Sequence, residues 1–92
     1  MSETHVLIVD DEAALVRSLS YALSGEGMVP RAVYSGEAAL ELLADSKVEV
    51  DIVLLDLGLP GIDGIATLDG LRKLRPDLPV IMISAHGDTR AA

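Results

Sequence analysis

The sequence predicts an α/β fold in which helices cover both faces of a parallel sheet. Short β-branched runs alternate with longer segments whose apolar residues recur at helical spacing, in the order βαβαβαβα. These runs are apolar without interruption, as in strands that are buried on both faces. Strands that alternate with helices form parallel sheets through right-handed crossovers. The chain has 92 residues, of which 50% are hydrophobic, and we expect residues 1–92 to form one domain.

The first half of the chain predicts two strand–helix units. Residues 5–9 form the first predicted strand, and residues 12–24 form a helix in which leucines recur every four residues before two glycines. Residues 28–33 form a weaker strand that contains Pro30. Proline cannot donate a ladder hydrogen bond, so this strand suits an edge position. Residues 37–45 form the second predicted helix.

The second half predicts two more strands and the helices that follow them. Residues 51–55 and 80–83 are short apolar runs typical of buried strands. Asp63 is a good N-cap for a third helix over residues 64–75. Residues 88–90 resemble the cap and first turn of a fourth helix. The apolar row predicted to face the core from the third helix consists of Ile65, Leu68, Leu71 and Leu74.

Composition excludes several classes of function. Fifteen acidic residues against seven basic ones give a net charge of -8, which argues against direct nucleic-acid binding. The absence of cysteine excludes disulfides, thiolate zinc sites and a cysteine nucleophile. The sequence has no signal-peptide pattern at its start and no apolar run of about 18 residues. We therefore expect a cytoplasmic protein with no membrane contact.

Carboxylates follow two of the predicted strands at the point where each strand ends. Asp10 and Asp11 follow the first strand, Asp56 follows the third, and Ser84 follows the fourth. In doubly wound sheets, ligands bind beyond the carboxyl ends of the strands. If the first and third strands are neighbours, like charges meet there and repel by about 1–4 kcal/mol per pair near 4 Å. A divalent cation removes this cost, and an oxygen-only ligand set favours Mg²⁺.

Each of these residues also has a purely structural interpretation. Asp10 or Asp11 alone could cap the first helix. Asp56 alone could be a loop residue, and Ser84 alone a turn hydroxyl. The coincidence of all four residues at one edge of the sheet is what favours a binding site.

Three segments carry a family resemblance in the expected order and spacing. They are VLIVDDE at residues 6–12, DIVLLDLGLPGIDG at 51–64 and PVIMISA at 79–85. The chain resembles the receiver domain of bacterial two-component response regulators, and residues 83–88 are weakly similar to receivers of sigma-54-dependent activators. The resemblance implies a flavodoxin-like doubly wound parallel sheet with strand order 2-1-3-4.

The resemblance also implies a role for each site residue. Asp56 is similar to the phosphoacceptor, and it would bind Mg²⁺ together with Asp11 and the backbone carbonyl of Gly58. Asp10 would hold the ion through water. Two further residues match the phosphoryl-binding and switch positions of the family, namely Ser84 and Ala85.

The implied function is signal transduction. A sensor histidine kinase would phosphorylate Asp56, and the domain would control an attached output domain such as a transcription regulator. The domain is then a phosphoacceptor rather than an enzyme, apart from slow self-dephosphorylation. Two alternatives remain: a degenerate interaction or dimerisation module, and a Mg²⁺-dependent hydrolase with an aspartate nucleophile. Such hydrolases usually place a second aspartate two residues after the nucleophile, whereas Asp10 is followed by Asp11 and Glu12.

Part of the family pattern has no counterpart in this sequence. Receivers continue through a fourth helix, a fifth strand ending in a catalytic lysine, and a fifth helix. Lys47 and Lys73 fall elsewhere in the predicted topology, so no catalytic lysine is assigned. We therefore expect a receiver truncated in its fourth helix, either naturally or by shortening. Residues 80–83 would then be a bare edge strand through which a homodimer could form.

Overall fold

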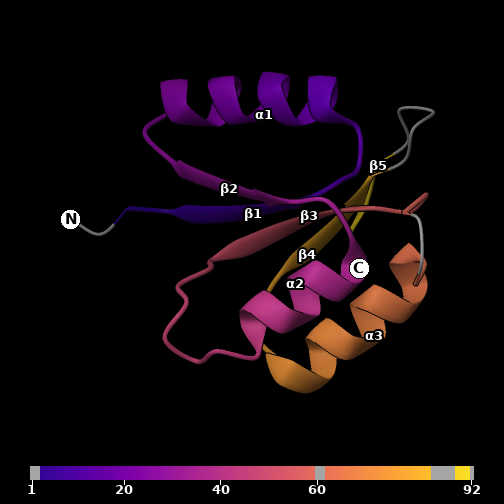
Figure 1. Cartoon of the computed structure of the whole chain (residues 1–92). Coiled ribbons are helices and arrows are strands. Elements are labelled where there is room, and N and C mark those ends of the chain that lie inside the picture. The colour runs from indigo at the N-terminus through magenta and orange to yellow at the C-terminus, as the bar shows by residue number, and fades with distance from the viewer. Residues whose placement is uncertain (1–2, 60–61, 84–88, 92) are drawn as a thin grey trace.

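The computed structural model describes residues 3–59, 62–83 and 89–91. It contains a twisted sheet with strand order β2-β1-β3-β4-β5, in which the first four strands are parallel (Figure 1). The predicted α/β fold and the order 2-1-3-4 are confirmed. The elements are β1 (His5–Val9), α1 (Ala13–Gly25), β2 (Val29–Val33), α2 (Gly36–Leu43), β3 (Ile52–Asp56), α3 (Gly64–Leu74), β4 (Val80–Ile83) and β5 (Thr89–Ala91).

The predictions for the end of the chain need correction. Residues 89–91 form the short strand β5 and not the first turn of a fourth helix, and β5 pairs antiparallel with β4. The prediction of a bare edge is therefore wrong over Ile81–Ile83. Unpaired backbone groups at an edge offer hydrogen bonds to any extended segment, and here the chain itself supplies that segment. β5 is not the parallel fifth strand of the family, and homodimer formation stays a prediction.

The sheet divides the core into two layers. α1 covers one face, and α2 and α3 cover the other (Figure 1). Strand residues alternate between the two faces, so Leu7 and Leu55 pack under α2 and α3, while Val6 and Ile8 pack under α1. The layer under α2 and α3 contains most of the fully buried aliphatic residues. On the α1 side, the open part of the sheet is lined by half-buried residues, including Ile52, Leu54 and Ile81.

Helices α2 and α3 begin at side-chain caps. Ser35 Oγ accepts a hydrogen bond from the amide of Ala38 at 3.1 Å. Asp63 Oδ1 accepts one from the amide of Ala66 at 2.8 Å, as the sequence predicts. These bonds satisfy amides that have no partner inside the helix.

The buried stripe of α3 differs from the predicted apolar row. Ile65 is 63% exposed and Leu74 is 44% exposed. The buried residues are Gly64, Thr67 and Leu71, spaced three and four residues apart along one side of the helix. The prediction was wrong for Ile65 and Leu74 because glycine and threonine, which are not apolar side chains, mark the contact face.

β2 is an edge strand that carries its proline on the free side. The amide of Val29 donates to the carbonyl of Thr4 at 2.8 Å, so it points toward β1. Amides alternate in direction along a strand, and the backbone nitrogen of Pro30 therefore points away from the sheet. The missing N–H costs no ladder bond, which confirms the predicted edge position.

Arg75 joins the end of α3 to the connection between α2 and β3. Its guanidinium donates to the carbonyl oxygens of Val48 and Asp45, each at 2.8 Å. The two carbonyls are 27 and 30 residues away in the chain. These bonds hold a connection that has no regular secondary structure.

Arg75→Met should lower the free energy of unfolding by about 1–3 kcal/mol, because two charge-assisted hydrogen bonds are lost while much of the aliphatic stem is kept. Urea unfolding followed by circular dichroism measures the change. Arg72→Met is the matched control on the same turn, since Arg72 is exposed and should change stability by no more than about 0.5 kcal/mol. Equal effects in the two variants would contradict this role for Arg75.

Candidate functional site

Three carboxylates meet at the carboxyl ends of the two central strands. β1 and β3 pair with Val9 opposite Leu55, so the residues that come next, Asp10 and Asp56, are neighbours. Asp11 lies beside them. One carboxylate oxygen from each residue lies within 4.8 Å of the other two. The structure therefore brings together the three acidic residues that the sequence singles out.

Asp10 is buried, with an exposed fraction of 2%. Its amide donates to the carbonyl of Val33 at 3.2 Å, which continues the pairing of β1 with β2. Its Oδ1 accepts from the amide of Glu12 at 2.8 Å, just before α1 begins. Asp10 thus holds the backbone just before α1 and also faces the cluster. It does not cap α1, whose N-cap residue is Glu12 with no side-chain cap hydrogen bond, and its role toward an ion stays a prediction.

Asp56 is 5% exposed at the last position of β3. Its Oδ1 accepts from the amide of Gly58 at 3.1 Å. The next amide, that of Leu57, donates to the carbonyl of Ile83 at 2.8 Å and extends the pairing with β4. The carboxylate is therefore oriented by the first residues of the loop that follows β3.

The site concentrates negative charge on three neighbouring carboxylates. The pKa of Asp10 is raised from its usual value, chiefly because burial disfavours the ionised carboxyl. The hydrogen bond from Glu12 opposes this shift, while the nearby charges of Asp56 and Asp11 add to it. A bound cation would offset both the cost of burying the ionised carboxyl and the repulsion among the three carboxylates.

The donor set fits Mg²⁺. All three side chains offer carboxylate oxygens, and neither histidine nor cysteine is among them. Hard cations prefer oxygen ligands, and Mg²⁺ typically takes one or two carboxylates and keeps several waters. Asp11 is exposed and Asp10 and Asp56 are buried, so the cluster is open to solvent on one side.

The other residues named in the sequence prediction lie at different places in the chain. Gly58 is exposed in the loop directly after Asp56, with its backbone next to the cluster. Ser84 and Ala85 lie outside the described residues. Lys47 precedes β3 at the opposite end of the sheet, and Lys73 pairs with Asp69 at 3.0 Å in the last turn of α3. Neither lysine lies at the cluster, as the sequence predicts.

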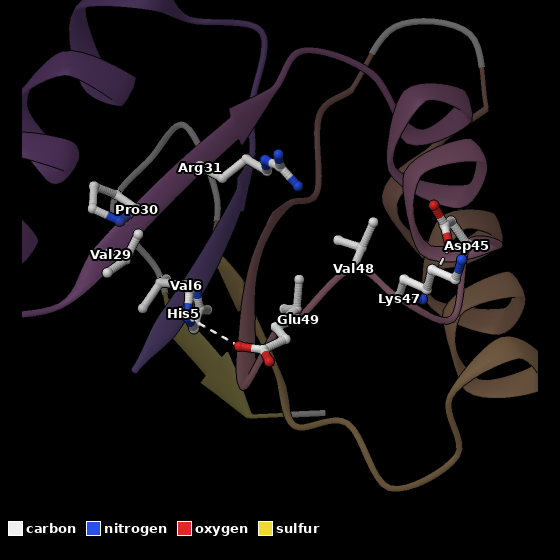
Figure 2. Close-up of a pocket in the computed structure, with 10 residues that line it drawn as sticks. His5, Val6, Val29, Pro30, Arg31, Asp45, Lys47, Val48 and Glu49 are labelled. Atoms are coloured by element: carbon white, nitrogen blue, oxygen red, sulfur yellow. Dashed lines mark hydrogen bonds and ion pairs between the residues drawn. The ribbon is translucent and has the colours of Figure 1, made fainter. Parts of the chain in front are cut away.

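A cavity of about 500 Å³ lies at the amino ends of β1 and β2, away from the carboxylates. Figure 2 shows its charged lining, in which His5 Nε2 contacts Glu49 Oε2 at 3.3 Å. Arg31 reaches over the space from β2 (Figure 2). The sequence does not predict this cavity, because its lining residues come together only through the connection between α2 and β3. The cavity shares no residue with the acidic cluster.

Fold and site together define a flavodoxin-like α/β domain with a cluster of three carboxylates at the carboxyl ends of its central strands. The sequence-family model of the response regulator receiver domain matches residues 6–92 of this chain. The chain belongs to this family.

Curated relatives with similar sequences are also response regulators. The chain is 40% identical over 87 residues to the DNA-binding transcriptional regulator NtrC of Escherichia coli, covering 95% of this chain and 18% of that protein. It is 38% identical over 94 residues to a putative NtrX-like response regulator of Rickettsia felis, covering 100% of this chain and 19% of that protein. The chain thus spans about a fifth of the length of these curated relatives.

Solved structures of response regulator proteins have a fold similar to that of this chain. A CheY-like receiver domain protein of Methanospirillum hungatei superposes with a TM-score of 0.86 at 28% identity, covering 95% of this chain and 68% of that chain. The response regulator TrrA of Thermotoga maritima, in complex with Mg²⁺ and BeF, superposes with a TM-score of 0.81 at 32% identity, covering 89% of this chain and 70% of that chain. The chain is thus a receiver domain of the two-component response regulator family, a phosphoacceptor module.

No helix in the described part of the chain has the length and apolar character needed to cross a membrane.

Asp10→Asn should stabilise the protein near pH 7 when no divalent cation is present. Because the pKa of Asp10 is raised above 3.8 in the folded state, the folded state binds more protons than the unfolded state between pH 3.8 and the folded pKa. The contribution of Asp10 to the free energy of unfolding therefore falls as pH rises through this interval. Asparagine keeps the oxygen that accepts from Glu12 and removes the charge.

Urea unfolding in the presence of a chelator measures this gain, which should fade as the pH falls toward 3.8. Asp77→Asn is the control, since Asp77 is exposed and follows α3 at the far end of the sheet. A stability difference between Asp10→Asn and the unmutated protein that does not depend on pH would contradict the assignment.

Proposed function

We propose that this receiver domain accepts a phosphoryl group on Asp56 from the phosphohistidine of a sensor kinase, in a Mg²⁺-dependent reaction. The observation that carries the proposal is the meeting of Asp10, Asp11 and Asp56, with one oxygen of each within 4.8 Å of the others. Phosphoryl transfer requires mainly positioning and charge neutralisation, and this cluster can supply both.

Asp56 would act as the nucleophile. Its Oδ1 is held by the amide of Gly58, which leaves Oδ2 free of protein donors among the described residues. One carboxylate oxygen would form a bond to phosphorus while the bond from phosphorus to the kinase imidazole breaks. The product is an aspartyl phosphate, and slow hydrolysis would restore the carboxylate.

Asp11, Asp56 and the carbonyl of Gly58 would hold Mg²⁺ directly, and Asp10 would hold it through water. The ion would neutralise charge on both the carboxylates and the phosphoryl oxygens. By family resemblance, Ser84 and Ala85 occupy the phosphoryl-binding and switch positions. The acidic cluster at the carboxyl edge of the sheet supports the metal assignment.

The proposed output is transcription regulation through a separate domain of a longer protein. NtrC of E. coli, of which this chain matches 18%, is named as a DNA-binding transcriptional regulator. The net charge of -8 makes direct DNA contact by this domain unfavourable, so DNA binding is assigned to the output domain. The proposed location is cytoplasmic, where the kinase would meet the receiver.

Mg²⁺ should stabilise the fold by about 1.4–2.7 kcal/mol at 10–100 times its dissociation constant. Asp11→Asn should remove most of this stabilisation and Asp10→Asn less of it, because Asp11 is assigned direct contact with the ion. Thermal melts with Mg²⁺ or with a chelator measure the effect, and Asp77→Asn should respond as the unmutated protein does. Coincident melts of the unmutated protein would show that the metal assignment is wrong.

Asp56→Asn should abolish phosphorylation. Incubation with acetyl phosphate and Mg²⁺, followed by intact-mass measurement, should give one phosphoryl adduct on the unmutated protein and none on the variant. The near-isosteric change removes one of three like charges, so circular dichroism should show an unchanged fold. An undiminished adduct on the variant would refute the assignment. Rapid turnover of acetyl phosphate by the unmutated protein would favour a hydrolase, and no reaction at all would favour an interaction module.

A further inference from the structure

We propose that Gly64, the first residue of α3, is a positioning residue for the acceptor site. The inference rests on the proposed function of Asp56. A methyl group added at Gly64 would lie 2.8 Å from the backbone oxygen of Asp56 and 2.9 Å from the Cα atom of Leu57. Real Cβ atoms essentially never approach other atoms this closely. The start of α3 is thus in direct backbone contact with the residues that carry and follow the phosphoacceptor.

The contacted backbone cannot yield toward β4. The amide of Leu57 donates to the carbonyl of Ile83 at 2.8 Å, which holds this segment at the end of the sheet. The backbone of Asp56 and Leu57 therefore lies between β4 on one side and α3 on the other. Backbone atoms also cannot rotate away as a side chain can.

Helix α3 cannot easily withdraw either. Thr67 is fully buried against α2, where a Cβ atom at Gly36 would overlap its hydroxyl oxygen. One turn further along, a Cβ atom at Gly70 would lie 2.7 Å from Cδ2 of Leu40. α2 and α3 thus approach closely at two places, and separating them would open a close-packed layer. A methyl group at Gly64 would then displace the Asp56–Gly58 backbone.

Such a displacement would act on the proposed chemistry. The amide of Gly58 orients Asp56 Oδ1 at 3.1 Å, and the carbonyl of Gly58 is the proposed backbone ligand of the ion. A shift of a few tenths of an ångström would move both groups relative to Asp10 and Asp11. Since misplacement by about 1 Å can cost on the order of 100-fold in rate, we expect Gly64→Ala to lose about tenfold in Mg²⁺ affinity and in the rate of phosphorylation.

The experiment compares Gly64→Ala with Gly70→Ala in the full chain. Both add one methyl group to the same helix, but the atoms nearest to Gly70 belong to the end of the Leu40 side chain, which can turn aside. Mg²⁺ affinity from titration calorimetry and the rate of adduct formation with acetyl phosphate are measured on folded protein. Trimethylamine N-oxide is added to all samples if either variant is partly unfolded.

The expected result is weakened Mg²⁺ binding and slower phosphorylation in Gly64→Ala alone. Unmutated values in Gly64→Ala, or equal losses in both variants, would overturn the inference. A Gly64→Ala chain that stays unfolded with the osmolyte would also overturn it, because the glycine would then serve the fold as a whole. If the unmutated protein neither binds Mg²⁺ nor forms an adduct, the proposed function itself fails, which is a distinguishable outcome.

Discussion

The acidic edge depends on the parallel pairing of β1 with β3. This pairing places Asp10 beside Asp56, and the repulsion between carboxylate oxygens within 4.8 Å of each other opposes it by about 1–4 kcal/mol. The same pairing buries aliphatic side chains that are fully withdrawn from water, each worth about 1.5–3 kcal/mol. These side chains are Leu7, Val9, Val53 and Leu55. Their burial outweighs the repulsion, so the aliphatic core holds together a cluster of like charges that would otherwise separate.

Relief of that charge within the described residues comes from backbone amides. Asp10 accepts from the amide of Glu12, and Asp56 accepts from the amide of Gly58. Each donor amide also lies in the connection that follows the strand, between β1 and α1 or between β3 and α3. The bonds that orient the carboxylates are thus the bonds that shape the two connections, and the geometry of the site follows from the path of the backbone.

The sequence was sufficient where a local pattern decides the structure. Unbroken apolar runs that contain β-branched residues predicted β1, β3 and β4, and the carboxylates that follow two of these strands predicted the cluster. Features that depend on distant segments were not predictable. Arg75 finds its carbonyl partners 27 and 30 residues away, and residues 89–91 become a strand only because β4 offers an open edge. The buried stripe of α3 was missed because Gly64 and Thr67 are selected for close approach and not for hydrophobicity.

Phosphorylation in the acidic cluster would change the net charge of the domain only slightly, which limits the ways in which it could act as a signal. Three ionised carboxylates would carry a charge of about -3, and conversion of one of them to an acyl phosphate would replace a single negative charge by about -1.5 to -2. The net change is therefore no more than about one unit, on a chain whose charge is already -8. A long-range electrostatic effect of this size would be weak and screened by salt. The larger change would be local, because a compact group with three strong acceptor oxygens would then stand at the end of β3. Groups that donate hydrogen bonds to those oxygens, and not the overall field of the domain, are the means by which such a site can transmit its state.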